Sequence, residues 1–201
     1  MLKTLLQNNA AWAAERVAQD PGYFKRLSNI QKPHYFWIGC SDSRVPANVI
    51  AGLEPGEVFV HRNVANLVNP GDLNCLSVLQ FAVEALQVRE IIVTGHYGCG
   101  GIQAAVDGER HGIIDHWLQP IRDTAAHRTE ELAKLPEGRA RLDRLCELNV
   151  QAQVQRVAET PIVQDAWKRG QPLLVHGLVY GLTDGRLRNL GCTLPSDVED
   201  T

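Results

Sequence analysis

The sequence predicts an α/β fold in which helices flank a mostly parallel β-sheet. Two compact runs, 34–39 and 90–95, are rich in β-branched and aromatic residues, as buried strands are. The longer apolar segment between them, 73–87, lacks strict alternation, which is typical of a helix. Since alternating strands and helices favour parallel pairing, functional groups should gather beyond the carboxyl ends of the strands.

The first part of the chain predicts two helices and a strand. Residues 4–19 mix apolar and charged side chains at helical spacing, and the pattern stops around Pro21, so we expect an amphipathic helix. A second, short helix is expected at 23–29. The run 34–39 then predicts a buried strand that places Cys40 at its carboxyl end.

The middle of the chain predicts strands that alternate with helices. A brief helical turn at 46–50 precedes a strand at 57–61. Residues 73–87 are long enough for a largely buried helix. The strongest strand pattern, 90–95, comes next, and His96 follows it immediately. Two predicted strands therefore end beside residues that can bind a metal.

The last part of the chain predicts helices and then a hairpin. Residues 113–158 are rich in helix-forming side chains, and a helix at 161–168 begins with a proline, which suits a first helical turn. Residues 173–181 predict a strand, and the turn within 182–187 predicts a final strand alongside it. After residue 191 we expect a loose, polar tail.

Composition indicates one ordinary globular domain. The chain has 201 residues, of which 44% are hydrophobic and 21% charged, and its net charge of -3 supplies no electrostatic reason to bind nucleic acid or an acidic membrane. We see neither a secretory signal pattern nor the ~18 apolar residues of a membrane span. We expect a single domain over 1–201, with a helical arm at 1–30, an α/β core at 31–190 that carries the potential metal ligands, and a tail at 191–201.

Cysteine usage favours reduced thiols that can bind metal. The five cysteines are odd in number and widely spaced, which suits a cytoplasmic protein better than a disulfide framework. Cys40, His96 and Cys99 offer two sulfurs and an imidazole, a combination that suits tetrahedral zinc. A lone cysteine is more often a small buried hydrophobe. The strand-end positions and the glycine-rich surroundings favour the zinc centre.

Asp42 and Arg44 determine whether the fourth coordination position of the zinc is occupied by protein or open. A catalytic zinc usually has three protein ligands and an open position, whereas a structural zinc has four protein ligands. Asp42 is either the fourth ligand or a hydrogen-bond acceptor beside an open position. Arg44 can hold a carboxylate through two parallel hydrogen bonds, which would leave the position open. The alternative is a solvated turn pair of little consequence.

Three segments resemble the signature of the β-class carbonic anhydrases. They are 40–44 (Cys-Ser-Asp-Ser-Arg), 61–66 (His-Arg-Asn-Val-Ala-Asn) and 95–101 (Gly-His-Tyr-Gly-Cys-Gly-Gly). The resemblance extends from about residue 31 to residue 180. It implies zinc-dependent, reversible hydration of carbon dioxide to bicarbonate, in dimers or tetramers whose amino-terminal helices pack on a neighbouring subunit.

The same resemblance implies roles for individual residues, with one zinc ion per subunit. Cys40, His96 and Cys99 would bind the zinc, and Asp42 would be a ligand only in an inactive state; Asp42 and Arg44 would be catalytic. Gly100 would bind the substrate, as would Gln31, which reaches across a dimer interface. Trp37, Arg62 and Tyr180 would form an allosteric bicarbonate pocket.

The pocket residues resemble those of one regulated subtype. There, bound bicarbonate favours the state in which Asp42 binds zinc, so inhibition by bicarbonate and by low pH is expected. Guanidinium, indole and phenol groups are all donors for a small oxyanion. The alternative is core packing for Trp37 and Tyr180 and a structural ion pair for Arg62.

Two other functions use the same residues. A hydrolase for a related linear substrate such as carbon disulfide would differ in access rather than in ligands. A non-catalytic zinc protein would keep Asp42 as a permanent fourth ligand, although such a site has no need of Arg44. A redox role is weaker, because the chain has no Cys-x-x-Cys pair.

Overall fold

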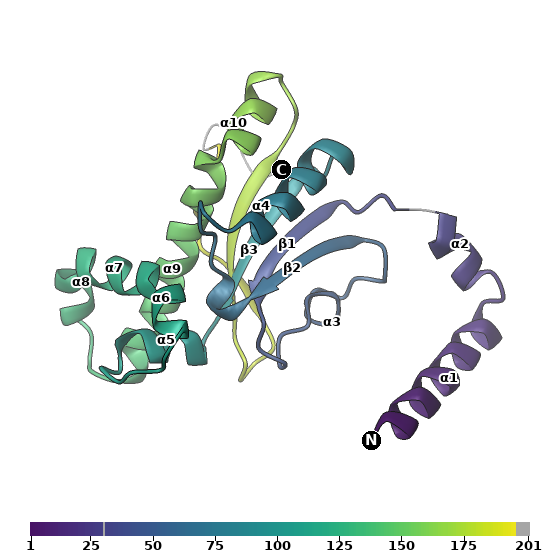
Figure 1. Ribbon diagram of the computed structural model, residues 1–201, viewed down its shortest axis with the longest axis horizontal. Helices are drawn as coiled ribbons and strands as arrows, with labels where there is room; N and C mark the ends of the chain where they lie inside the picture. Colours follow the sequence, from purple (N-terminus) through teal and green to yellow (C-terminus); the bar gives the residue numbers. More distant parts are fainter. Residues whose placement is uncertain (30, 196–201) are drawn as a thin grey trace. The chain divides into compact units, whose positions relative to one another are not determined.

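A computed structural model of the chain describes residues 1–29 and 31–195 (Figure 1). The chain divides into two compact units, Met1–Lys32 and Pro33–Thr201. The first unit consists of α1 (Leu2–Gln19) and α2 (Tyr23–Asn29), both close to their predicted ranges. The second unit carries the sheet.

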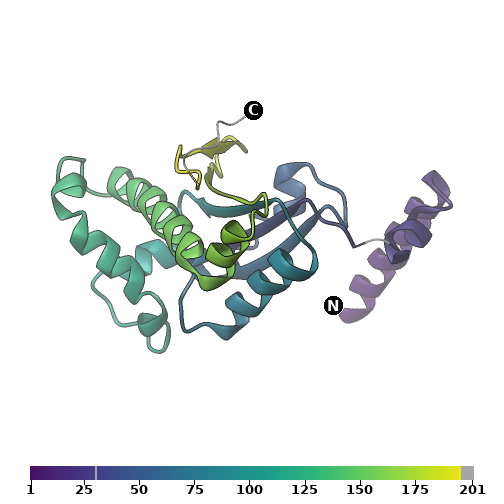
Figure 2. The same cartoon turned by 90° about the horizontal axis from the view of Figure 1, so that it is seen from above.

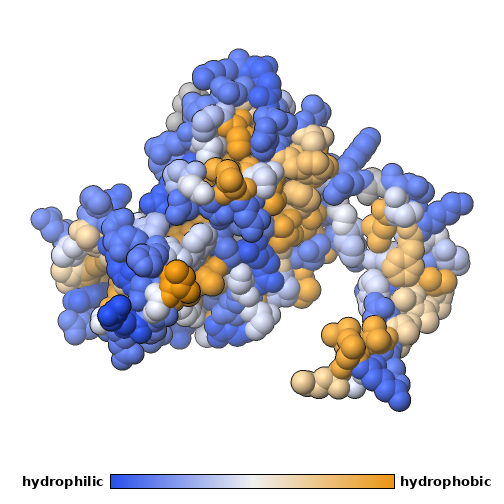
Figure 3. Space-filling model, viewed as in Figure 1, coloured by the Kyte–Doolittle hydropathy of each residue, from blue (hydrophilic) through white to orange (hydrophobic). Residues whose placement is uncertain are grey.

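The amino-terminal unit has no buried helical residue. Its two helices meet through aromatic side chains, with the rings of Trp12 and Phe24 packed edge to face at 5.7 Å. The unit nevertheless exposes apolar side chains along its helices (Figure 3). Those exposed residues are Leu2, Leu5, Leu6, Trp12, Val17 and Phe24.

The second unit is built on a five-stranded sheet of order β2-β1-β3-β4-β5. The first four strands in this order pair in parallel, and β5 pairs antiparallel with β4. The prediction of a mostly parallel α/β sheet is therefore confirmed. The strands are β1 (Tyr35–Cys40), β2 (Val58–Asn63), β3 (Glu90–His96), β4 (Leu174–Tyr180) and β5 (Leu187–Asn189).

Helices and short helical turns connect the strands of this unit. They are α3 (Ala47–Ala51), the 3-10 turn η1 (Val64–Asn66), α4 (Leu73–Gln80), the π-helical turn η2 (Phe81–Ala85), α5 (Gly100–Val106), α6 (Ile114–Trp117), α7 (Gln119–His127), α8 (Thr129–Ala133), α9 (Arg139–Glu159) and α10 (Pro161–Lys168).

One face of the sheet packs against α4, α9 and α10, which lie on the same side of it (Figure 2). Phe36, Ile38 and Val93 from the strands share the core there with Val150 and Val154 of α9, and all five are at most 1% exposed. The opposite face is less covered. Along β4 the burial alternates, so every second side chain is buried against the helices and the others are half-buried.

Two sequence predictions need correction. The helix expected at 73–87 is not largely buried, since α4 and η2 have two buried residues each, and it changes from α4 to the π-helical turn η2 after Gln80. The tail is not loose through residue 195, because Leu194 and Val175 exchange backbone hydrogen bonds of 2.9 and 2.8 Å. The apolar side chain of Leu194 packs against the core, which explains this pairing. The rest of the predicted tail, 196–201, and Ile30 lie outside the described residues.

No helix among residues 1–29 and 31–195 has both the length and the apolar character needed to cross a membrane.

Candidate metal centre

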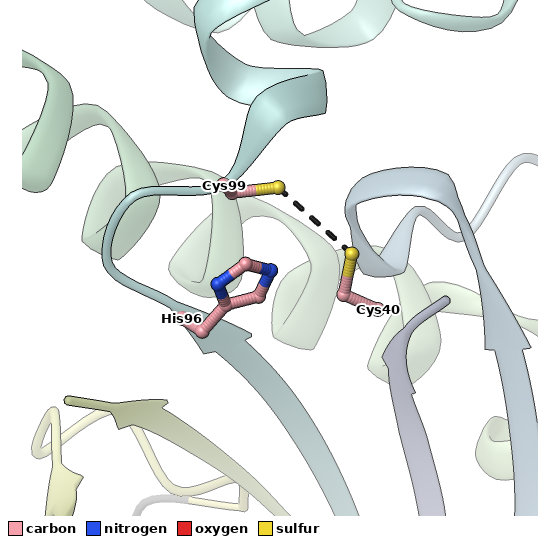
Figure 4. A group of neighbouring side chains, drawn as sticks. All are labelled: Cys40, His96 and Cys99. Atoms are coloured by element: carbon pink, nitrogen blue, oxygen red, sulfur yellow. Dashed lines mark hydrogen bonds between the residues drawn. The ribbon is translucent and has the colours of Figure 1, made fainter. Parts of the chain in front are cut away.

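The potential ligands meet because two neighbouring parallel strands end at the same edge of the sheet. Cys40 is the last residue of β1, and His96 is the last residue of β3. Beyond β3, Gly98 adopts a positive φ of 68°, which glycine tolerates at little cost. This turn brings Cys99, the residue before α5, back over His96 (Figure 4).

The geometry of the three ligand atoms fits tetrahedral zinc. The sulfurs of Cys40 and Cys99 are 3.9 Å apart, and the two sulfurs and one imidazole nitrogen all lie within 4.8 Å of one another. Zinc–sulfur bonds of about 2.3 Å at a tetrahedral angle would separate two sulfurs by about 3.8 Å. The residues present therefore match the size of the ion.

His96 is oriented for ligation. Its Nδ1 lies 3.1 Å from the carbonyl oxygen of Tyr97 and donates to it, which leaves the lone pair on Nε2. The side chain is 1% exposed, and Nε2 has no hydrogen-bond partner among the described residues. An unpaired buried nitrogen requires an explanation, and a metal ion supplies it.

The contact between the two sulfurs shifts the pKa values of Cys40 and Cys99 in opposite directions. The hydrogen bond from the Cys99 thiol lowers the pKa of Cys40, and the same contact raises the pKa of Cys99. Backbone N–H groups of Asp42 and Ala65 lower the pKa of Cys40 further. The thiolate form that metals require is thus favoured at Cys40 before a metal arrives.

The Asp42 carboxylate lies beside the ligands and is held by Arg44. The guanidinium donates from Nε to Oδ1 at 2.9 Å and from Nη2 to Oδ2 at 2.6 Å, and the Arg44 backbone N–H donates to Oδ1 at 2.9 Å. These bonds keep the pKa of Asp42 well below its usual range. Asp42 Oδ2 is 3.7 Å from His96 Nε2, so the carboxylate borders the metal position while Arg44 engages both of its oxygens.

Arg62 supports the same segment from β2. Its Nε donates to the carbonyl oxygen of Cys40 at 2.8 Å, and its Nη2 donates to that of Asp42 at 2.5 Å. Strand register places Trp37, Arg62 and Tyr180 on one face of the sheet, opposite to α9. No hydrogen bond within 1–29 and 31–195 joins these three side chains, so their predicted pocket stays a prediction.

Among the described residues, the remaining predicted site residues make no side-chain hydrogen bond to the centre. Gln31 is exposed and belongs to the amino-terminal unit. Gly100 is exposed at the start of α5, and an added Cβ there would meet nothing within 4 Å. The indole of Trp37 is 2% exposed and packs over Gly39, where a Cβ would lie 2.5 Å from its Nε1.

A second group of potential ligands, His61, Asp72 and Cys75, is better explained by hydrogen bonding. The Asn63 side-chain amide is fixed by two 2.7 Å bonds to the backbone of Leu67, so its Nδ2 also donates to His61 Nε2 at 3.2 Å. The imidazole proton therefore lies on Nδ1. Because burial raises the pKa of Cys75 to about 12, its thiol stays protonated.

Sequence reasoning missed the role of η1, which follows β2. The Ala65 backbone N–H lowers the pKa of the Cys40 thiol, and the indole of Trp117 donates to the Val64 carbonyl oxygen at 2.8 Å. Neither contact has a sequence signal, because Ala65 adopts a positive φ of 63° without being glycine.

Comparison with known proteins identifies the family. The carbonic anhydrase family model matches residues 35–187, which include all the ligands and the Asp42–Arg44 pair. The chain belongs to the carbonic anhydrase family. A carbonic anhydrase of Emericella nidulans (strain FGSC A4) is 44% identical over 196 residues, which cover 98% of this chain and 86% of the relative.

Solved structures place the enzyme in the β class. A structure from a study of two tetrameric β-carbonic anhydrases of Sordaria macrospora matches with a TM-score of 0.91 and 39% identity, over 96% of this chain and 98% of that chain. The Coccomyxa β-carbonic anhydrase in complex with acetazolamide matches with a TM-score of 0.91 and 42% identity, over 94% and 86%. The enzyme hydrates carbon dioxide, and its cofactor is zinc.

Proposed function

We propose that Cys40, His96 and Cys99 hold one zinc ion per subunit and that the reversible hydration of carbon dioxide to bicarbonate takes place beside it. The 3.9 Å sulfur separation and the unpaired Nε2 of His96 support this assignment. When bound, zinc acts as a Lewis acid that lowers the pKa of a coordinated water from 15.7 to about 7. The protein residues supply orientation and charge.

Asp42 and Arg44 form the catalytic pair of this proposal. Asp42 stays ionised at neutral pH because Arg44 donates to both of its oxygens. Its Oδ2 accepts a hydrogen bond from the reacting water, which orients that water toward carbon dioxide. Arg44 holds the carboxylate through both oxygens, so Cys40, His96 and Cys99 would be the three protein ligands of a zinc ion. Gly100 binds the substrate, and so does the Gln31 side-chain amide of a neighbouring subunit, across a dimer interface.

Asp42→Asn tests this arrangement because Asn keeps the shape and removes the charge. We expect zinc content to remain at one ion per subunit while the hydration rate falls by about 100-fold or more. Zinc stoichiometry and stopped-flow hydration assays on the wild type and the variant measure both quantities. Loss of zinc in the variant would instead support the structural alternative, with Asp42 as a permanent ligand, and an unchanged rate would remove Asp42 from catalysis.

We propose that Trp37, Arg62 and Tyr180 bind a regulatory bicarbonate. Arg62 donates to the carbonyl oxygens of Cys40 and Asp42, so an anion that draws its guanidinium away would loosen the segment that carries Asp42. Asp42 could then leave Arg44 and bind zinc, which inhibits the enzyme. This coupling predicts that activity falls with bicarbonate. Activity should also fall below about pH 8, because a carboxylate bound to zinc would have to be displaced before water could bind.

Steady-state rates across pH and bicarbonate concentration test the regulation. In Trp37→Phe the indole donor is absent, and in Arg62→Ala the guanidinium is absent. We expect both variants to lose bicarbonate sensitivity and to keep more of their activity at low pH. Identical profiles in the wild type and both variants would show that these residues serve packing alone.

Self-association as a dimer or tetramer is also proposed, with the arm at 1–30 packing on a neighbouring subunit and 31–190 forming the zinc-binding core. The leucines of α1 support it, since Leu2, Leu5 and Leu6 are 71%, 62% and 58% exposed. Leu5→Asp should lower the solution mass measured by sedimentation, whereas Lys3→Asp on the same helix should not. Equal masses would contradict the role of the arm.

The proposed compartment is the cytoplasm. The cysteines at 40, 75, 99, 146 and 192 are all free, and a thiolate zinc site requires reduced sulfur.

A further inference from the structure

Tyr97 lies between two proposed zinc ligands in the chain and presents its backbone carbonyl to the first of them. His96 Nδ1 donates to this carbonyl oxygen at 3.1 Å, and Nε2 of the same ring is the proposed ligand atom. In metal sites, the partner of the second ring nitrogen sets the direction of the imidazole and its strength as a ligand. The position of the Tyr97 carbonyl therefore affects how His96 can hold a metal.

The side chain of Tyr97 is anchored on α9. Its hydroxyl donates to Glu147 Oε1 at 2.6 Å, and the other oxygen of that carboxylate accepts from Arg144 Nη1 at 2.6 Å. Arg144 also donates from Nε to Glu131 Oε1 of α8, at 2.7 Å. The carboxylate that accepts from the phenol is thus itself held by a guanidinium, and such charge-assisted bonds are the stronger kind.

Contacts on the other sides leave Tyr97 little freedom to move. Its backbone N–H donates to the Tyr180 carbonyl oxygen at 3.0 Å, which continues the pairing of β3 with β4. The Arg188 guanidinium lies over the ring, 5.9 Å from its centroid. The next residue, Gly98, has the positive φ that turns the chain toward Cys99. Because the N–H and the ring are both held, the directions in which the carbonyl can point are limited.

We propose that Tyr97 is a positioning residue for the zinc centre and that Glu147 acts on the centre through it. The inference rests on the proposed ligation of zinc by His96. The bond between the hydroxyl and the carboxylate holds the Tyr97 carbonyl where it accepts from His96 Nδ1, and this bond in turn orients Nε2. Loss of the hydroxyl lets the carbonyl move, which weakens the bond to Nδ1 and makes His96 a poorer ligand.

Cobalt substitution of the full chain gives a readout of this imidazole alone, because His96 is the one histidine among the proposed ligands. Its ring protons should be hyperfine-shifted in the proton NMR spectrum, and the proton on Nδ1 should be the one that exchanges with water. In Tyr97→Phe we expect this resonance to shift and its exchange to become faster. Chelator competition should show about tenfold weaker metal binding.

Glu147 supplies the matched variants. Glu147→Ala removes the acceptor and should reproduce the changes seen in Tyr97→Phe, whereas Glu147→Gln keeps an acceptor oxygen and should retain most of the wild-type signal and affinity. Because the two residues share one bond, the double variant Tyr97→Phe, Glu147→Ala should show no larger change than Tyr97→Phe alone.

Glu131→Ala is the control. Glu131 shares Arg144 with Glu147, but within the described part of the chain it makes no hydrogen bond to Tyr97. This variant should keep the wild-type spectrum and affinity. A spectrum and affinity unchanged in Tyr97→Phe would overturn the proposal. Equal changes in Glu131→Ala and Glu147→Ala would overturn it too, because the effect would then come from Arg144.

Two further outcomes are decisive. A wild-type cobalt form without a hyperfine-shifted histidine proton would overturn ligation by His96 itself, which is a separate failure. If Tyr97→Phe does not fold, Glu147→Ala makes the same test with the tyrosine in place. If neither variant folds, the bond serves stability, and the positioning role is overturned.

Discussion

At the scale of single residues, the five cysteines differ in chemistry because their surroundings differ. Cys40 is favoured as a thiolate by its hydrogen bonds, whereas burial raises the pKa of Cys75 and of Cys146 to about 12. Cys192 is half-buried in the segment after β5, and burial raises its pKa as well. Reactivity should follow exposure and thiolate content.

Alkylation of the zinc-loaded enzyme by iodoacetamide at pH 8 should modify Cys192 first. Cys75 and Cys146 should react only once the chain unfolds, because they are buried and protonated. Peptide mass spectrometry over time measures the order. Modification of Cys75 at the rate of Cys192 would contradict the burial of that thiol.

The same thiols predict an alkaline loss of stability. Their ordinary pKa is 9.0, and in the folded chain it is about 12, so unfolding releases protons between these values. The free energy of unfolding should therefore fall as pH rises from 9 through 12. Urea unfolding at several pH values should show a smaller slope against pH for Cys75→Ala than for the wild type. Equal slopes would show that Cys75 does not contribute to the loss of stability at alkaline pH.

At the scale of the elements, close approach of α9 to the sheet depends on small residues in the strands. A Cβ at Gly95 of β3 would lie 2.6 Å from Val150 Cγ2, so the helix leaves no room for a side chain there. Gly95 immediately precedes His96, and the fit of the helix therefore fixes the end of the strand from which that ligand projects.

Gly95→Ala should lower the free energy of unfolding by about 1–3 kcal/mol, because overpacking forces the helix or the strand to move. Adding Val150→Ala should restore part of this loss, since it removes the clashing methyl groups. Gly100→Ala is the control, because a Cβ there meets nothing within 4 Å. Urea titrations compare five chains: the wild type, Gly95→Ala, Val150→Ala, the double variant and Gly100→Ala. A double variant whose loss of stability equals the sum of the two single losses would contradict the contact.

The elements also show which features the sequence could predict. The sequence predicts strands that end at Cys40 and beside His96. Because parallel strands end at the same edge of a sheet, it also predicts that these two residues lie close together. The sequence did not predict the η1 turn, because Ala65 and Asn66 carry no glycine signal. The turn is held from distant segments, since Trp117 donates to the Val64 carbonyl oxygen and Asn149 donates to that of Ala65. Pairing of the tail depends likewise on a partner strand remote in sequence. The Asp42–Arg44 pair was predicted because its members are close neighbours in the chain.

At the scale of the whole molecule, the ligands come from the two innermost parallel strands and from the loop that follows one of them. The proposed zinc therefore joins segments nearly sixty residues apart. A metal that binds only the folded arrangement stabilises it.

Zinc removal should therefore lower the thermal unfolding midpoint of the enzyme. A strong chelator supplies the test, and added zinc should restore the midpoint. Cys40→Ser is the control, because it lacks one sulfur ligand and should respond weakly to either treatment. If the thermal unfolding midpoint of the wild type did not change with the chelator, zinc binding would not stabilise the fold.

The packing of Trp37 over Gly39 limits which substitutions these two positions can tolerate. Any side chain at position 39 would collide with the indole, whose Nε1 would lie 2.5 Å from the new Cβ. Substitution at position 39 therefore requires a smaller residue at position 37 first. Among relatives, these two positions should covary, and sequences that keep tryptophan at the first should keep glycine at the second. We therefore expect substitutions at these two positions to occur together.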